Sequence, residues 1–260
     1  MQDLHRIIRT VLVGAVMSVT LASASAWADL TAEQANALRM NIVTGDKAAL
    51  ETLITEAQQG NRYAQIGLGD FYYRTIGARQ DYSQAAQWYR KAAEQGDAYG
   101  QFLLGMLYGF GRGVPQDYSQ ERQWTLKAAE QGYADAQVAM GDFYWGGHGV
   151  RQDLSQVVQW YRKAAEQGNA YAQSLLSDLY EDGVGVPQNK VVAYALLNLL
   201  AAQEFSSGDR YASDRRSKLA NRMTEQQIEA GQALTGKMSV QGHLLQALDQ
   251  YLAASADNKR

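Results

Sequence analysis

The six-residue sequence Lys-Ala-Ala-Glu-Gln-Gly occurs three times in this chain at a fixed spacing of 36 residues. The copies begin at Lys91, Lys127 and Lys163. Self-similarity at a fixed period of this size is typical of repeat arrays, in which one supersecondary unit is stacked several times. A single unit cannot bury its own apolar face, so such a chain is stable only as a stack of neighbours. This period therefore constrains the fold more than any local signal does.

Four copies of the unit fit the chain when it is aligned on this period. They occupy residues 59–94, 95–130, 131–166 and 167–204. Several columns hold the same residue in every copy. They include Gln65, Gln101, Gln137 and Gln173; Tyr72, Tyr108, Tyr144 and Tyr180; Gly77, Gly113, Gly149 and Gly185; and Gln80, Gln116, Gln152 and Gln188. No linker rich in proline or serine separates the copies, so the pattern predicts one continuous array.

Each copy contains the signals of two helices joined by a turn. In the first copy Ala64, Leu68 and Phe71 follow the i, i+4, i+7 spacing of a buried helical stripe. Asp81 suits the N-cap of the second helix, and Gly96 suits its C-terminal end. The period and these signals together predict an all-α fold, a right-handed α/α solenoid of helix-turn-helix repeats.

Both ends of the array are predicted to be helical caps. Residues 29–58 contain two helical segments, and the second runs into Glu-Ala-Gln-Gln-Gly, which is similar to the end of a repeat. Residues 205–260 are predicted to form further capping helices and a short tail. Thr224 and Gln227 have the spacing of a capping box at one helix start.

The third copy has a pattern that resembles the Sel1-like repeat family, a relative of the tetratricopeptide repeat. The pattern runs from Ala136-Gln137 through Gly141-Asp142-Phe143-Tyr144 to Trp160-Tyr161-Arg162-Lys163-Ala164-Ala165-Glu166-Gln167-Gly168. The resemblance covers residues 59–204, although the fourth copy has Leu196 in place of the tryptophan. It implies a non-catalytic scaffold or adaptor of the exported bacterial type, with a role in periplasmic assembly, envelope-linked signalling or contact with a host.

The first 28 residues predict export. Two arginines precede an apolar run at Val11–Ala24, and Ala26-Trp27-Ala28 offers a cleavage site before Asp29. A membrane anchor is the alternative, but the run is shorter than the ~20 residues that span a bilayer. We therefore expect cleavage after Ala28 and a periplasmic or secreted protein without stable membrane insertion.

Composition narrows the range of partners. The chain has 24 basic and 27 acidic side chains, and loss of the signal peptide removes Arg6 and Arg9 against Asp3, which changes the net charge from −3 to −4. A mildly acidic chain is a poor match for nucleic acid or an anionic membrane. The absence of cysteine excludes disulfides and thiolate metal sites. We expect a monomer that binds a protein or peptide and uses no metal or other cofactor.

A search for catalytic residues finds no nucleophile paired with a base. Only His148 and His243 remain after residue 28, and no His-Glu-x-x-His, Ser-x-x-Lys, Gly-x-Ser-x-Gly or Walker A pattern occurs. Gly109–Gly113 is rich in glycine but recurs with the array, so it is interpreted as a turn rather than a phosphate loop. The resemblance leaves one enzymatic alternative, a β-lactam-binding or β-lactam-hydrolysing protein, as described for cysteine-rich members of the family. A carbohydrate binder that uses aromatic rings is a third hypothesis.

Trp88, Trp124 and Trp160 recur at one position of the second helix. Their spacing follows the period of the array, so we expect this column in the core between repeats rather than on a ligand platform. The lysine and glutamate of Lys-Ala-Ala-Glu are expected on the solvated face.

The candidate binding surface is a stripe on the first helices, at positions spaced i, i+4, i+8 and i+11. In solenoids of paired helices the first helices line the concave face. Several of these positions vary between copies and mix aromatic anchors with acidic groups, as expected of a protein-binding groove. Drift at positions free of packing constraints is the alternative explanation. The predicted binding residues are Arg62, Ile66, Asp70, Tyr73, Phe102, Met106, Asp142, Trp145, Asp178 and Glu181.

Overall fold

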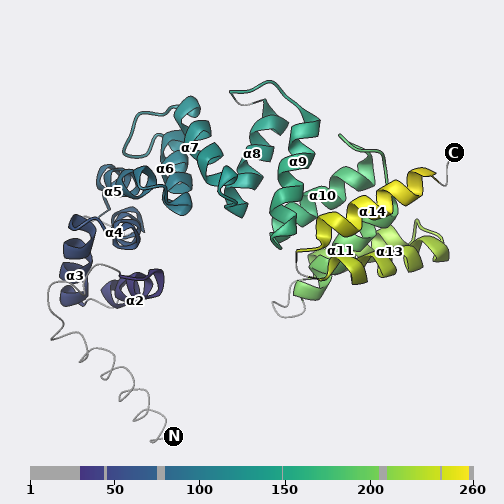
Figure 1. The fold of residues 1–260 in the computed structure, drawn as a ribbon, viewed down its shortest axis with the longest axis horizontal. Helices are drawn as coiled ribbons and strands as arrows, with labels where there is room; N and C mark the ends of the chain where they lie inside the picture. The colour runs from purple at the N-terminus through teal and green to yellow at the C-terminus, as the bar shows by residue number, and fades with distance from the viewer. Residues whose placement is uncertain are drawn as a thin grey trace, which may run out of the picture. The chain divides into compact units, whose positions relative to one another are not determined.

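The computed structural model describes residues 30–43, 46–74, 80–147, 149–204, 210–240 and 242–257. The predicted signal peptide, Gly77 and His148 lie outside these ranges. Within them the regular structure consists of 13 helices and no strand (Figure 1). The helices are α2 (Ala32–Val43), α3 (Lys47–Gln58), α4 (Arg62–Arg74), α5 (Tyr82–Glu94), α6 (Ala98–Phe110), α7 (Tyr118–Glu130), α8 (Ala134–Gly146), α9 (Leu154–Glu166), α10 (Ala170–Asp182), α11 (Lys190–Glu204), α12 (Tyr211–Ala220), α13 (Glu225–Met238) and α14 (Leu244–Asp257).

The all-α solenoid predicted from the period is confirmed. Helices α4, α6, α8 and α10 are the first helices of the four copies, and α5, α7, α9 and α11 are the second helices. The chain divides into two compact units, Met1–Ala92 and Ala93–Arg260, and each is described by itself below.

The predicted helix ends are confirmed at atomic detail. The Asp117 carboxylate accepts from the backbone N–H groups of Ser119 and Gln120 at 2.9 and 3.0 Å, and thereby caps α7. Asp81 and Asp153 make the equivalent contacts at the starts of α5 and α9. The second helices end before glycines with positive φ, which only glycine adopts at low cost: Gly96, Gly132 and Gly168, with φ of 86°, 91° and 82°. Thr224 and Gln227 form the reciprocal capping box at the start of α13.

Buried glutamines connect the first helix of each repeat to the helix that precedes it in the chain. In α8 the Gln137 side chain is 5 % exposed, and its Nε2 donates to the Ala129 carbonyl at the end of α7, 3.1 Å away. The Gln137 Oε1 accepts from Gln167 Nε2 at 2.7 Å. The same amide-to-carbonyl bond recurs at Gln65, Gln101 and Gln173. Hydrogen bonding makes this buried polar column compatible with the core.

The first unit is a small helical stack. Helix α2 packs against both α3 and α4, and the core beneath it contains Leu53, Ala57, Ala64 and Leu68. The predicted N-terminal capping helices are therefore present, and α2 lies against a first helix of the array.

The second unit ends in a larger apolar core. Seven consecutive residues of α11, Val191–Leu197, are buried, because α12 and α13 also pack on this helix. Helix α14 packs against α13 and α9. Its first turn is capped by Glu166, whose Oε2 accepts from the Leu245 N–H at 2.6 Å. The expectation that every glutamate of Lys-Ala-Ala-Glu is solvated is therefore wrong for Glu166, although Glu94 and Glu130 are exposed.

Candidate functional site

The candidate residues lie at the four predicted stripe positions of α4 in the first unit and of α6, α8 and α10 in the second, and we call this set of positions the first-helix face. Its members divide into three groups: acidic residues that contact a capping helix, one acidic residue that does not, and a set of apolar and aromatic residues.

Repeats one and three build the same polar arrangement on this face. In repeat one the Tyr89 hydroxyl donates to Asp70 Oδ1 at 2.7 Å, and in repeat three the Tyr161 hydroxyl donates to Asp142 Oδ1 at 2.5 Å. The glycine before each aspartate makes this possible, because a methyl group at Gly141 would overlap the Tyr161 ring, as one at the equivalent glycine of repeat one would overlap Tyr89. Glycine, aspartate and tyrosine thus form one structural set that occurs twice.

Asp70 is not accessible on this face. Its side chain is only 1 % exposed, and its second carboxylate oxygen, Oδ2, pairs with the Arg39 guanidinium of α2. Arg39 also donates to Asn36 at 2.6 Å, which holds the guanidinium in place. The prediction of Asp70 as a partner-binding residue is therefore corrected, because a capping helix 31 residues earlier in the sequence supplies its ion pair.

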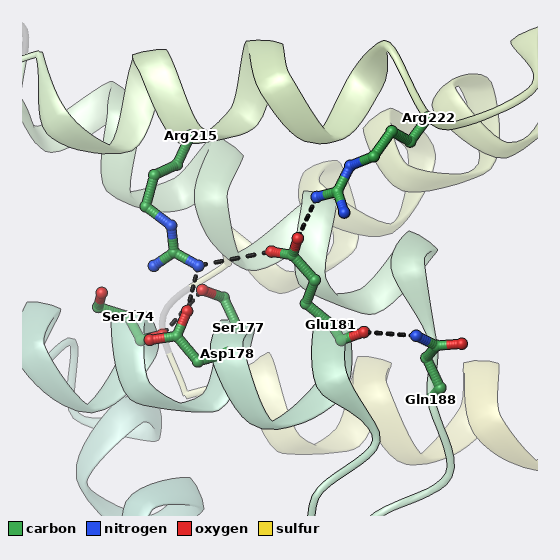
Figure 2. A network of polar contacts seen from close by, with 7 residues as sticks. All are labelled: Ser174, Ser177, Asp178, Glu181, Gln188, Arg215 and Arg222. Atoms are coloured by element: carbon green, nitrogen blue, oxygen red, sulfur yellow. Dashed lines mark hydrogen bonds and ion pairs between the residues drawn. The ribbon is translucent and has the colours of Figure 1, made fainter.

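Asp178 and Glu181 are also occupied by a capping helix. Figure 2 shows Arg215 of α12 and Arg222 of the turn after it facing these two carboxylates of α10. Arg215 pairs with Asp178 and lies 3.5 Å from Glu181, while Arg222 pairs with Glu181. Burial raises the pKa of Asp178, and the charge of Arg215 opposes that rise. We conclude that these two predicted residues hold the C-terminal cap in place.

Asp142 is the acidic member without a basic partner. It is exposed, and Tyr161 is its one hydrogen-bond partner among the described residues. Partial burial raises the pKa of Asp142, and the hydrogen bond from Tyr161 lowers it by a smaller amount. Burial and the contact with Asp142 in turn raise the pKa of Tyr161, which keeps this hydroxyl a proton donor.

The apolar members differ in exposure. Trp145, on the same face of α8 as Asp142, is 45 % exposed. Phe102 and Met106 of α6 are half-buried, and the Phe102 ring lies 5.3 Å from that of Tyr133. Phe102 also packs against the cluster that contains Ala136 and Met140 of α8. In repeats two and three, both in the second unit, these positions are thus apolar around the carboxylate of Asp142.

The predicted members in repeat one are arranged differently. Ile66 and Tyr73 are half-buried, and the Tyr73 ring lies 5.3 Å from that of Tyr82. Arg62 is exposed, and its guanidinium lies 4.8 Å from the centre of the Tyr63 ring.

The tryptophan column is only partly in the core. Trp160 is 8 % exposed and belongs to a core cluster, as expected. Trp88 and Trp124 are half-buried, so the expectation of a core position is wrong for them. A lysine one turn later covers each ring, with Lys127 Nζ 3.9 Å from the Trp124 ring centre. In repeats one and three the next residue is a tyrosine and lies deeper, since Tyr89 and Tyr161 are 1 % and 3 % exposed.

Other chemistry has little support in the part of the chain that the structure describes. No group of three or more His, Cys, Asp or Glu side chains gathers there in a way that could hold a metal ion. None of the described helices combines the length and apolar composition needed to span a membrane.

A family model and the solved structures both match this chain to the Sel1 repeat. A family model described as Sel1 repeat matches residues 62–97, 98–133, 134–169 and 170–205, a frame three residues later than the one chosen from the sequence. Among solved structures, a Sel1 repeat protein from Oxalobacter formigenes is 27% identical, with a TM-score of 0.61, 79% of this chain covered and 90% of that one. No match was found among curated proteins.

A second solved structure is longer than this chain. The protein c5321, described as a protective antigen present in uropathogenic Escherichia coli strains and displaying an SLR fold, is 29% identical, with a TM-score of 0.60. The match covers 87% of this chain but 54% of the other, so this chain corresponds to about half of that protein.

Proposed function

Because this chain belongs to the Sel1 repeat family, whose repeats generally mediate protein–protein interactions, we propose that it binds a protein partner on the first-helix face of its second and third repeats. The family is generally non-catalytic, and we propose that this member is a scaffold or adaptor without an enzymatic activity of its own. No comparison and no arrangement of the described side chains supports the β-lactam alternative.

The observation that carries this proposal is the contrast between the third repeat and the first and fourth repeats. Asp70, Asp178 and Glu181 are occupied by arginines of the caps, whereas Trp145 and Asp142 of α8 are exposed together. Tryptophan is one of the residue types enriched among those that dominate the energy of protein interfaces. Trp145 is therefore an exposed aromatic residue that a protein partner can bury on binding.

Site-specific photocrosslinking in the native host tests the location. A photoreactive phenylalanine analogue at Trp145 should form an adduct with a discrete protein, and the same analogue at Gln159 on the exposed side of α9 should not. Equal adducts from both positions, or none from Trp145, would exclude the first-helix face as the binding surface.

Export remains part of the proposal and rests on the sequence of residues 1–28, which lie outside the described ranges. The basic start, apolar run and Ala-Trp-Ala site support cleavage after Ala28 and a periplasmic or secreted location. Mass spectrometry of the protein from its native host should find Asp29 as the first residue. Recovery of intact Met1 from the cytosol would contradict it.

A further inference from the structure

We infer that the partner presents an arginine side chain to Asp142, with its guanidinium between the free carboxylate oxygen and the exposed ring of Trp145. The inference rests on the proposed function, because it names the chemistry of the group that the first-helix face receives. Contacts that the chain itself makes at equivalent positions support it.

The first contact that supports it is the one in repeat one. Asp70 and Asp142 occupy the same column, follow a glycine and accept the same tyrosine hydroxyl through Oδ1. At Asp70 the remaining oxygen, Oδ2, is paired with an arginine from another helix, and the carboxylate is buried. Repeat one thus shows the occupied form of an arrangement whose second copy has an exposed carboxylate.

The second contact is the one in repeat four. Asp178 is in the same column and lacks the tyrosine, yet it too is paired with an arginine, Arg215 of α12. The column contains three aspartates, and the fourth position is Met106. Two of the three aspartates therefore bind a guanidinium from a helix that is not part of their own repeat. Asp142 is the third, and no cationic side chain in the described ranges pairs with it.

Trp145 makes arginine a better fit than a simple cation. It lies three residues after Asp142, and residues at this spacing are neighbours on a helix surface. A guanidinium is planar, donates to a carboxylate in a forked geometry and stacks on aromatic rings, whereas an ammonium group is a compact and strongly hydrated charge. Arg215 already combines these contacts within the chain, since it pairs with Asp178 and its Cζ lies 5.6 Å from the centre of the Tyr211 ring.

A metal ion is a poorer candidate for the same position. Asp142 would be a single carboxylate ligand, and the described residues place no group of three or more ligating side chains together. A carboxylate beside a tryptophan matches a guanidinium and leaves a metal ion short of ligands.

The probe is a phage-displayed library of random 12-residue peptides, selected on the full mature chain. Wild-type protein should enrich peptides that contain arginine. The strongest binder is then synthesised in three forms, with the arginine intact, replaced by lysine, or replaced by citrulline, which keeps the shape but has no charge. Calorimetry measures the Kd of each form against wild-type protein, Asp142→Asn and a matched control, Asp182→Asn, which neutralises an exposed aspartate of α10 away from this column.

We expect citrulline to weaken binding to wild-type protein by about tenfold or more, and lysine to weaken it less. The same citrulline change should have little effect on binding to Asp142→Asn, because this variant lacks the carboxylate that pairs with the charged arginine. Asp182→Asn should behave as wild type. Circular dichroism checks that Asp142→Asn remains folded.

Two results would overturn the inference, and they differ in whether the proposed binding surface is also rejected. If peptides lose binding to Trp145→Ala but show no dependence on arginine or Asp142, the arginine contact is wrong and the proposed surface is supported. Peptides that bind equally well to Trp145→Ala and Asp142→Asn would show that the first-helix face is not the binding surface, which removes the proposed function as well.

Discussion

At the scale of single residues, chemically equivalent side chains have different roles in this protein. Asp70 and Asp142 have the same column, the same preceding glycine and the same tyrosine donor. One is buried beneath Arg39 and contributes to the N-terminal cap, and the other is exposed. The difference depends on whether a capping helix passes over the position, and this separates a stabilising ion pair from a candidate binding residue.

The first residue-scale prediction concerns the pH dependence of stability. The raised pKa of Asp142 means that the folded state keeps this proton to a higher pH than the unfolded state. Stability therefore falls as the pH rises from the ordinary value of 3.8 through the raised pKa, and the loss is complete above it. Asp142→Asn, which still accepts from Tyr161, should be more stable than wild type at pH 7.

The stability gain of Asp142→Asn should disappear as the pH falls through the same window, because the wild-type aspartate is then protonated. Urea unfolding of both proteins at a series of pH values from 3.5 to 7 measures the difference in their free energy of unfolding. A variant that is less stable than wild type at pH 7 would show that the charged hydrogen bond to Tyr161 outweighs the cost of partial burial.

The second residue-scale prediction ranks two tryptophans. Trp160 is 8 % exposed within a core cluster, so Trp160→Ala should cost about 3–5 kcal/mol in the free energy of unfolding. Trp124 is half-buried beneath Lys127, so Trp124→Ala should cost about 1–2 kcal/mol, because less apolar area is lost. Equilibrium denaturation of both variants measures the two losses of unfolding free energy. Equal losses would show that the exposure of the tryptophan does not determine the cost of its removal.

At the scale of helices, close approach between partners depends on small residues at fixed positions. Gly141 lets the Tyr161 ring lie against the backbone of α8, and the paired alanines of the second helices, such as Ala164 and Ala165, are fully buried. The buried glutamine column then ties the end of one second helix to the next first helix. The glutamine position is the same in all four copies, whereas several positions of the first-helix face vary between them.

The element-scale prediction compares two glycines inside helices. A methyl group at Gly141 would overlap the Tyr161 ring, so Gly141→Ala should destabilise the fold by about 1–3 kcal/mol. At Gly236 in α13 nothing lies within 4 Å of the added carbon, so Gly236→Ala should stabilise it by about 0.5–1 kcal/mol through helix propensity. Thermal melts of the two variants should shift in opposite directions. Shifts in the same direction would mean that the α8–α9 contact adapts without cost.

At the scale of the whole molecule, the chain is a repeat array with caps of different construction. Helix α2 contributes Arg39 to the first repeat, while α12 and the turn that follows it contribute Arg215 and Arg222 to the fourth. Helix α14 instead packs on α9 and α13 and shares a core with α11. The caps thus cover apolar surface and also neutralise acidic positions of the terminal repeats.

The whole-molecule prediction concerns removal of α14. A chain that ends at His243 exposes the apolar core beneath Leu244, Ala247 and Leu248, so its unfolding midpoint should fall. Because contacts in repeat arrays are local, amide exchange should accelerate in α9, α11 and α13 and stay nearly unchanged in α7. Asp249→Asn, which removes only the ion pair to Arg162, should have a small effect, since an exposed pair contributes ~0–1 kcal/mol. Uniform acceleration of exchange would show that the array unfolds as a single unit.

The sequence by itself determined the repeat period, the order of the helices, the residues that cap the helix ends, and the family. These features depend on signals within a few residues of one another, such as an aspartate at an N-cap or a glycine with positive φ, and the 36-residue spacing repeats them. The sequence also predicted which residues of each first helix lie on one face, because helical periodicity fixes which positions share a face.

Only the tertiary structure decided which of those positions are open to a partner. Arg39 comes 31 residues before Asp70, and Arg215 comes 37 residues after Asp178, and no local pattern connects either arginine to its aspartate. The burial of Trp160, in contrast to Trp88 and Trp124, was likewise not visible in the sequence, because all three occupy one column. Accessibility is a property of neighbours that are distant in sequence, which is why the column of aspartates was visible in the sequence and the single free carboxylate, Asp142, was not.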